Sequence, residues 1–289
     1  MSIENANKLY SIYIPGYEFP QWVLDTKLWN SFNFKDTIVF YNKMDSLENV
    51  KKLMREREPC NISYRKIYFK DKLKEAFNYE IGAYDLSTKD KLMPNIAVYC
   101  YATFKIQTMY KNIHVLNLVG LAFDYLKQPD YIYYFNNNKT LNDIVEKYSK
   151  IWNYALVCAK YLKSINKIHK IKIYNVGGGA FAGPITNFIE DIFEPSFLPL
   201  LKEFNKYNIE VLGYDFKKKQ FNGGFIPNIF EDSSEDIENT LYINAWDPYS
   251  IIGNGNNNDR SLDGYYGRSS NMSVLGWSIT NPYLTYVYI

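Results

Sequence analysis

The residues best suited to chemistry lie near the C-terminus, in a loop rich in asparagine, aspartate and glycine. A strand predicted from Leu241 ends at Asn244, and Asp247, Asp259 and Asp263 follow it. Asparagine and aspartate side chains can bind ribose hydroxyls or orient a water molecule. Carboxylates that converge on one site repel each other, so at least one would have a raised pKa or bind a cation. The three aspartates are therefore candidates for catalysis, and the alternative is that they cap turns and helix ends in a surface loop.

Glycines in the same loop permit the close approach of a sugar phosphate, because they carry no Cβ. The candidate ligand contacts here, besides Asn244, are Gly253, Gly255, Asn256 and Gly264.

A second glycine-rich loop spans residues 177–183 and directly follows the apolar segment 171–176. Its backbone N–H groups, together with the positive N-terminal end of the next helix, can bind a phosphate. The alternative is a tight turn from strand to helix. The candidate contacts are Gly177, Gly178, Gly179, Ala180, Phe181 and Gly183.

The same loop can be compared with two known nucleotide-binding motifs. No Gly-Lys-Ser/Thr follows it, so it is not a Walker loop. Gly177, Gly179 and Ala182 match the degenerate G-x-G-x-x-A dinucleotide pattern, with Asp215 as a possible ribose ligand.

The elements that position both loops are predicted from hydrophobic patterning. We predict strands at 95–104, 113–123, 171–176, 209–216 and 241–244, a helix at 144–162, and a helix from 185 that breaks at Pro195 and resumes to about Phe204. Strands that alternate with helices of this length predict an α/β fold, with a mixed or mostly parallel sheet covered by helices on both faces. Ligands bind at the carboxyl ends of such strands, where both loops lie.

Composition limits the classes of partner. The 289 residues carry a net charge of +2, so no overall field attracts nucleic acid or a membrane surface. The three cysteines form no metal or disulfide pattern, and with two histidines we expect no metal site and no cofactor. No apolar run has the length of a membrane span. We therefore expect a soluble, cytoplasmic protein, in which His114 is a core residue.

The two loops resemble those of macrodomains, the ADP-ribose-binding α/β/α fold. The segment Ile243-Asn-Ala-Trp-Asp-Pro-Tyr-Ser, with the glycines after it, is similar to the Val-Asn-Ala-Ala-Asn segment beside the distal ribose. The segment from Asn175 to Pro184 is similar to the diphosphate-binding loop. The resemblance covers residues 95–289, which predicts a macrodomain-like domain there and an N-terminal α/β extension over residues 1–94 that packs on it.

The order of the two loops is reversed relative to ordinary macrodomains, and in this the chain most resembles the MavL-type group. Members of that group remove ADP-ribose from arginine of ubiquitin. The resemblance implies that Asn244 holds the distal ribose, that residues 177–183 bind the diphosphate, and that Asp247, Asp259 and Asp263 act on the water or on the leaving guanidine. Asp124 is a candidate for adenine, from its position alone. The alternatives are a non-catalytic reader of ADP-ribose and an NAD-dependent oxidoreductase.

Overall fold

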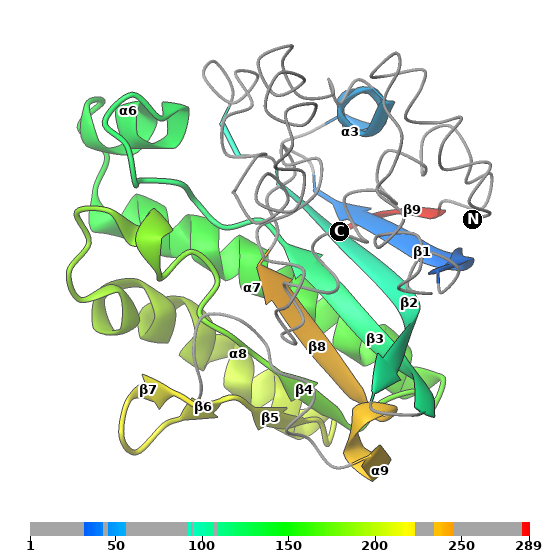
Figure 1. The fold of residues 1–289 in the computed structure, drawn as a ribbon. Helices are drawn as coiled ribbons and strands as arrows, with labels where there is room; N and C mark the ends of the chain where they lie inside the picture. The colour runs from blue at the N-terminus through cyan, green and yellow to red at the C-terminus, as the bar shows by residue number, and fades with distance from the viewer. Residues whose placement is uncertain are drawn as a thin grey trace, which may run out of the picture.

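The computed structural model describes residues 32–42, 46–55, 92–93, 95–106, 109–222, 234–245 and 285–289. Within them, a mixed seven-stranded sheet has the strand order β5-β4-β8-β3-β2-β1-β9 (Figure 1). β2 is antiparallel to its neighbours β1 and β3, and the other neighbouring pairs are parallel. The strands are β1 (Phe32–Tyr41), β2 (Ile96–Ile106), β3 (Met109–Leu118), β4 (Lys170–Lys172), β5 (Glu210–Leu212), β8 (Thr240–Ala245) and β9 (Thr285–Tyr288).

Two long helices form a layer on one face of this sheet. α7 (Leu141–Ser164) packs against β2 and β3, and α8 (Glu194–Lys206) packs against α7 and β5 (Figure 1). The other described α-helices are α3 (Leu47–Arg55), α6 (Pro129–Phe135) and the short α9 (Ser234–Ile237), and the structure also has a 3-10 helix, η4 (Ala180–Ala182), and a π-helix, η5 (Ile189–Phe193). A sheet of this kind with packed helices confirms the α/β prediction. Helices on both faces stay a prediction.

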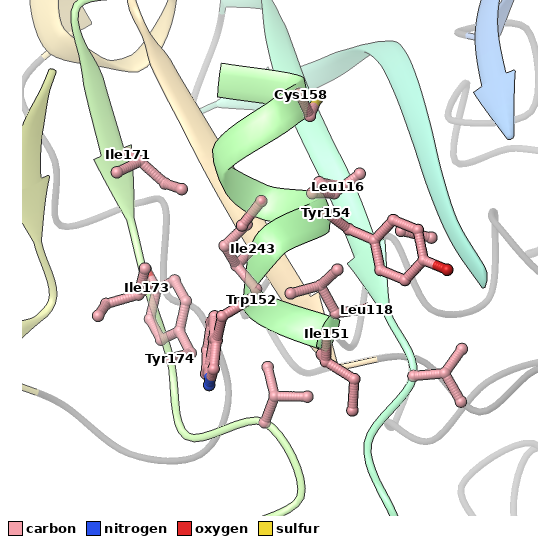
Figure 2. Packing of buried hydrophobic residues seen from close by; sticks show 14 of the residues in the cluster. Leu116, Leu118, Ile151, Trp152, Tyr154, Cys158, Ile171, Ile173, Tyr174 and Ile243 are labelled. Atoms are coloured by element: carbon pink, nitrogen blue, oxygen red, sulfur yellow. The ribbon is translucent and has the colours of Figure 1, made fainter. Parts of the chain in front are cut away.

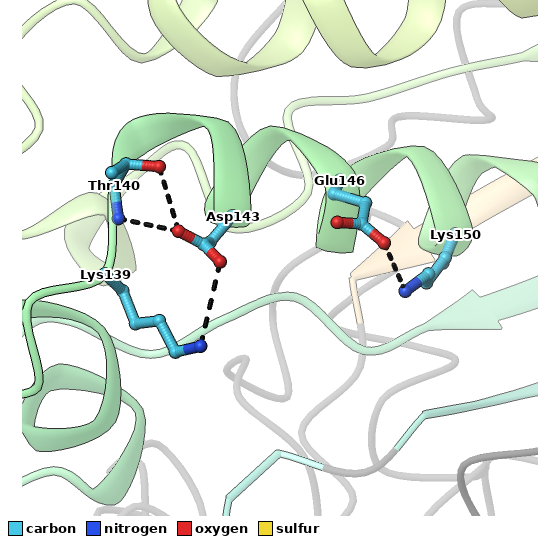
Figure 3. A network of polar contacts seen from close by, with 5 residues as sticks. All are labelled: Lys139, Thr140, Asp143, Glu146 and Lys150. Atoms are coloured by element: carbon cyan, nitrogen blue, oxygen red, sulfur yellow. Dashed lines mark hydrogen bonds and ion pairs between the residues drawn. The ribbon is translucent and has the colours of Figure 1, made fainter.

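The sequence of α7 accounts for its length and position. At its N-terminus the Asp143 carboxylate accepts hydrogen bonds from the N–H and the hydroxyl of Thr140, at 2.7 and 2.9 Å, and pairs with Lys139 (Figure 3). An acidic group there also interacts favourably with the positive end of the helix dipole. Glu146 and Lys150 form an i, i+4 ion pair on the exposed face. Apolar residues at helical spacing cover the opposite face, where they are buried: Ile144, Tyr148, Ile151, Trp152, Ala155, Cys158, Ala159 and Leu162.

These side chains pack against one face of the central strands. Figure 2 shows Leu116 and Leu118 of β3, Ile243 of β8 and Ile171 of β4 beside α7. β3 from Ile113 to Leu118 and β8 from Thr240 to Asn244 are buried along their length, so both faces of these two strands are shielded from solvent. This burial fits their nearly continuous apolar sequences.

Four local predictions were wrong in detail. The predicted strand 171–176 ends already at Lys172. The predicted strand 209–216 is interrupted at Gly213, whose φ of +92° brings its Cα against the Ile173 carbonyl, so the chain leaves the sheet and forms the hairpin β6 (Tyr214–Asp215) and β7 (Gln220–Phe221). The predicted strand ending at Phe123 ends at Leu118. Pro195 does not break the helix: the π-helical turn η5 (Ile189–Phe193) runs directly into α8, and Pro195 lies in the first turn of α8.

The predicted domain boundary after residue 94 stays a prediction. β1 comes before that boundary and is hydrogen-bonded to β2, which comes after it. None of the helices in the described ranges combines the length and the apolar character that crossing a membrane requires.

Candidate functional site

Three chain segments reach the same edge of the sheet. β8 lies between β4 and β3 and is parallel to both, so the carboxyl ends of the three strands are neighbours. The segments that leave these ends are residues 119–124 after β3 and residues 173–183 after β4, and β8 itself brings Asn244 to the edge. The fold therefore brings Asn244 and the glycine-rich loop to one edge, which is where α/β folds bind ligands.

Asn244 is buried and has a polar partner inside the sheet. It lies opposite Asn117 in the β3–β8 register, and its Nδ2 donates to Asn117 Oδ1 at 2.9 Å. Asn117 Nδ2 in turn donates to the carbonyl oxygen of Val98 on β2 at 3.0 Å. The exposed fractions of Asn117 and Asn244 are 0% and 1%. Asn244 Oδ1 is shielded from solvent and has no hydrogen-bond partner in the described part of the chain.

The direction of this pair follows from strand alternation. Successive side chains of a strand point to opposite faces. Leu116, Leu118 and Ile243 lie against α7 in Figure 2, and they alternate with Asn117 and Asn244. The two asparagines therefore project from the face of the sheet opposite α7.

The loop after β4 packs closely against the segment after β3. The Phe123 N–H donates to the Phe181 carbonyl at 2.9 Å. Gly183 has a φ of +54°, and a Cβ there would lie 2.1 Å from the Phe123 carbonyl oxygen. Gly177 has a φ of +75°, and its Cβ would lie 2.1 Å from the Tyr148 hydroxyl. At these two positions glycine is required by the backbone conformation and by the close packing.

Part of the hydrogen-bonding capacity of this loop is used inside it. The N–H of Gly178 donates to the Asn175 carbonyl, and the N–H of Ala182 donates to the Gly179 carbonyl. The Gly178 N–H is therefore used inside the loop in this conformation, and binding of a phosphate by the loop stays a prediction. The Asn175 carboxamide lies beneath Gly178, and its Oδ1 is shielded from solvent and lacks a hydrogen-bond partner among the described residues.

Sequence reasoning missed Asp130, which anchors the segment after β3. Its carboxylate accepts hydrogen bonds from the Ala122 N–H at 3.0 Å and from the Met93 N–H at 3.1 Å, and its exposed fraction is 2%. Burial raises the pKa of Asp130, and the two N–H groups partly oppose this. The available signal was Pro129 followed by an acid, which is typical of a helix N-terminus.

Tyr148 of α7 was predicted only as a core residue, and it also contacts the segment after β3 and the loop after β4. Its hydroxyl accepts a hydrogen bond from the Leu121 N–H at 3.3 Å and lies against Gly177. Burial raises the pKa of Tyr148 above its usual range, so the hydroxyl stays neutral. The helical spacing predicted the burial of Tyr148, but nothing in the sequence indicated its contacts with the segments after β3 and β4.

Asp124 follows Phe123 and therefore lies beside the Phe181–Gly183 turn. Its side chain is exposed. Partial burial raises the pKa of Asp124, but solvent around an exposed carboxylate screens most of this effect. Its contact with adenine stays a prediction.

The remaining predicted site residues lie outside the described residues. These are the catalytic candidates Asp247, Asp259 and Asp263 and the candidate contacts Gly253, Gly255, Asn256 and Gly264.

Two residues considered from the sequence have structural roles. His114 is buried, its Nδ1 is 2.8 Å from the Tyr99 hydroxyl, and burial followed by the charge of Lys167 lowers the pKa of His114 to about 4, which confirms a core histidine. Asp215 lies in the β6–β7 hairpin, where its Oδ1 accepts hydrogen bonds from two backbone N–H groups of the turn. These bonds show that Asp215 serves the turn of the hairpin through Oδ1, and its contact with a ribose stays a prediction.

Within the described ranges, no group of three or more His, Cys, Asp or Glu side chains is placed to bind a metal ion. No family model matches this sequence, and no curated protein matches it.

Proposed function

We propose that this protein binds ADP-ribose at the carboxyl edge of the sheet and removes it from modified protein, with arginine-linked ADP-ribose as the substrate. The observation that carries the proposal is the buried Asn244 Oδ1, an acceptor without a donor among the described residues, at the end of β8, which lies between β4 and β3. A buried polar atom left unpaired costs about 1–3 kcal/mol. A ligand hydroxyl at this position would supply the missing donor.

The surroundings of Asn244 support the same proposal. On one side of β8 lies the glycine-rich loop after β4, and on the other lies the segment 119–124 after β3, which ends at Asp124. A nucleotide with two ribose groups needs an extended edge of this kind, with a close backbone approach at the diphosphate. The sequence resemblance to macrodomains assigns the same segments to the same parts of ADP-ribose.

In the proposed reaction, water replaces the guanidine nitrogen at the anomeric carbon of the distal ribose. Asn244 Oδ1 accepts a hydrogen bond from a ribose hydroxyl and so fixes the sugar. One of Asp247, Asp259 and Asp263 takes a proton from the attacking water, and a second donates a proton to the departing guanidine. The C–N bond breaks, a C–O bond forms, and free ADP-ribose and unmodified arginine result.

Binding is tested first, by isothermal titration of the full chain with ADP-ribose, NAD and AMP. We expect ADP-ribose to bind more tightly than AMP, because only ADP-ribose carries the distal ribose that Asn244 would hold. Replacing Asn244 with leucine should weaken ADP-ribose binding and leave AMP binding nearly unchanged. An absence of ADP-ribose binding by the wild-type chain would refute the proposal, and tight NAD binding would favour an oxidoreductase.

Hydrolysis is tested by incubating the protein with arginine-ADP-ribosylated ubiquitin and measuring the ADP-ribose released. We expect at least two of Asp247→Ala, Asp259→Ala and Asp263→Ala to lose release while ADP-ribose binding is retained. Asp215→Ala is the matched control, because its carboxylate serves the β6–β7 turn, and it should release ADP-ribose at the wild-type rate. Binding without release by the wild-type chain would identify a reader instead.

A further inference from the structure

Two side-chain hydrogen bonds cross the centre of the sheet from β2 to the end of β8. They link the Val98 carbonyl to Asn117, at 3.0 Å, and Asn117 to Asn244, at 2.9 Å. We call these two bonds the Val98–Asn117–Asn244 chain. Both asparagines are buried, and the strands they join are already paired through their backbones. The chain is therefore not needed to bring the strands together.

The Val98–Asn117–Asn244 chain fixes which atom of each carboxamide faces which neighbour. A carbonyl oxygen only accepts hydrogen bonds, so Val98 selects the Nδ2 side of Asn117. Asn117 Oδ1 then faces Asn244 and selects its Nδ2. The atom of Asn244 left over is Oδ1, which is the atom without a partner in the described part of the chain.

We infer that Asn117 is a positioning residue for the site and makes the Asn244 position selective for hydrogen-bond donors; this inference rests on the proposed ADP-ribose function. Asn117 does not contact the ligand but holds Asn244 by its Nδ2, so that its Oδ1, which has no partner among the described residues, is directed away from Asn117. A ribose hydroxyl can donate to that oxygen. A phosphate or carbonyl oxygen cannot, because two acceptors repel each other.

The first test is a double-mutant cycle on ADP-ribose affinity, with Asn117→Leu and Asn244→Leu alone and together. Leucine is close to asparagine in size but makes neither hydrogen bond. We expect Asn117→Leu to weaken binding about tenfold, as for the loss of one hydrogen bond, and to cause no further loss in the Asn244→Leu background. If the two effects multiply instead, Asn117 does not act through Asn244 and the inference is wrong.

The matched control is Thr240→Val, at the other end of β8. The buried Thr240 hydroxyl donates to the Asp236 carbonyl, so this variant also removes a buried hydrogen bond from the same strand. It should lower the melting temperature and leave the affinity for ADP-ribose unchanged. A loss of affinity equal to that of Asn117→Leu would mean that general destabilisation explains both, and would overturn the inference.

Donor selectivity is tested with an ADP-ribose analogue in which fluorine replaces a distal ribose hydroxyl, because fluorine cannot donate. We expect the wild type to bind the analogue about tenfold more weakly than ADP-ribose. In Asn117→Leu the Asn244 carboxamide is free to turn its Nδ2 toward the ligand, so the difference should fall to about threefold or less. An unchanged difference would contradict the role assigned to Asn117.

A second variant covers the case in which Asn117→Leu does not fold. In Asn117→Asp, burial keeps the carboxyl group protonated, so its hydroxyl donates to the Val98 carbonyl and its carbonyl accepts from Asn244. This variant should keep affinity within about threefold of the wild type, which is less than the loss of one hydrogen bond. An affinity as low as that of Asn244→Leu would count against the inference.

Failure of the proposed function is distinguishable from failure of this inference. If the wild type does not bind ADP-ribose, the proposed function fails. The Val98–Asn117–Asn244 chain is then judged by hydrogen exchange of the Asn244 side-chain amide, followed by NMR. We expect slow exchange in the wild type and fast exchange in Asn117→Leu or, if that variant does not fold, in Asn117→Ala. Equal exchange in wild type and variant would overturn the inference independently of any ligand.

Discussion

Replacing Gly177 with alanine probes how the loops after β3 and β4 are held together. The new Cβ would lie 2.1 Å from the Tyr148 hydroxyl and 3.3 Å from the ring carbon that carries it. The hydroxyl must move away and lose the Leu121 N–H, which is 3.3 Å from it. Tyr148 is fully buried, so its ring has little room to move.

The cost of this substitution is the sum of three effects. A φ of +75° in a residue with a Cβ costs about 1 kcal/mol. Leaving the Leu121 N–H unpaired costs about 1–3 kcal/mol, and forcing the packed ring to shift costs about 1–3 kcal/mol. Gly177→Ala should therefore lower the free energy of unfolding by about 5 kcal/mol.

A second substitution, Tyr148→Phe, separates these effects. Alone it leaves the Leu121 N–H unpaired and should cost about 2 kcal/mol. Combined with Gly177→Ala it removes the clash, and the double variant should lose about 3 kcal/mol, against about 7 if the single effects were additive. Tyr148→Phe is thus expected to destabilise the wild type and to stabilise Gly177→Ala.

The assay is urea unfolding followed by circular dichroism and tryptophan fluorescence. Gly183→Ala is the matched control, because its Cβ would meet the Phe123 backbone, which Tyr148→Phe cannot relieve. Tyr148→Phe should therefore not rescue Gly183→Ala. Additivity of Gly177→Ala and Tyr148→Phe to within about 0.5 kcal/mol would refute the reasoning.

Three further predictions concern titrating groups. The pKa of His114 falls to about 4 on folding, so the free energy of unfolding should decrease by roughly 3 kcal/mol as the pH falls from about 6.5 to about 4. His114→Gln should abolish this dependence on pH, measured by urea unfolding at each pH, and an unchanged dependence would contradict the prediction. The pKa of Asp130 is raised on folding, so the wild type should lose stability relative to Asp130→Asn as the pH rises above about 4, and a pH-independent difference between these two proteins would contradict this. Asp130→Ala should be strongly destabilised at every pH, because two buried N–H groups lose their acceptor. The N–H and hydroxyl of Thr140 lower the pKa of Asp143, so Asp143→Ala should lower the melting temperature at pH 7 and converge on wild type as acid protonates Asp143, and a difference that persists in acid would argue against the cap.

Much of the fold was predictable because hydrophobic spacing reports burial directly. The apolar stripe of α7 and the continuous apolar strands around Val115 and Ile243 are properties of the local sequence, and the structure buries them as expected. The ends of the strands were less predictable. Gly213 ends β5 through a backbone conformation that depends on the Ile173 carbonyl, which lies forty residues earlier in the chain.

The candidate site divides in the same way. Residue types and spacing alone made Asn244 and the glycine-rich loop candidates, because polar and glycine residues after an apolar strand are a local signal. The partners that hold them come from elsewhere in the chain. Nothing near Asn244 in the sequence indicates Asn117, and nothing near Gly177 indicates Tyr148.

The sequence by itself determined the central strands and the long helix α7, and which residue types stand near the ends of those strands. Only the tertiary structure decided that β8 is inserted between β4 and β3, which brings Asn244 and the Gly177 loop to one edge and pairs Asn244 with Asn117. The burial of a segment is indicated by the spacing of its apolar residues, so it can be inferred from the local sequence. Strand order and hydrogen bonds between distant residues depend on the packing of the whole chain, and neither follows from any single segment.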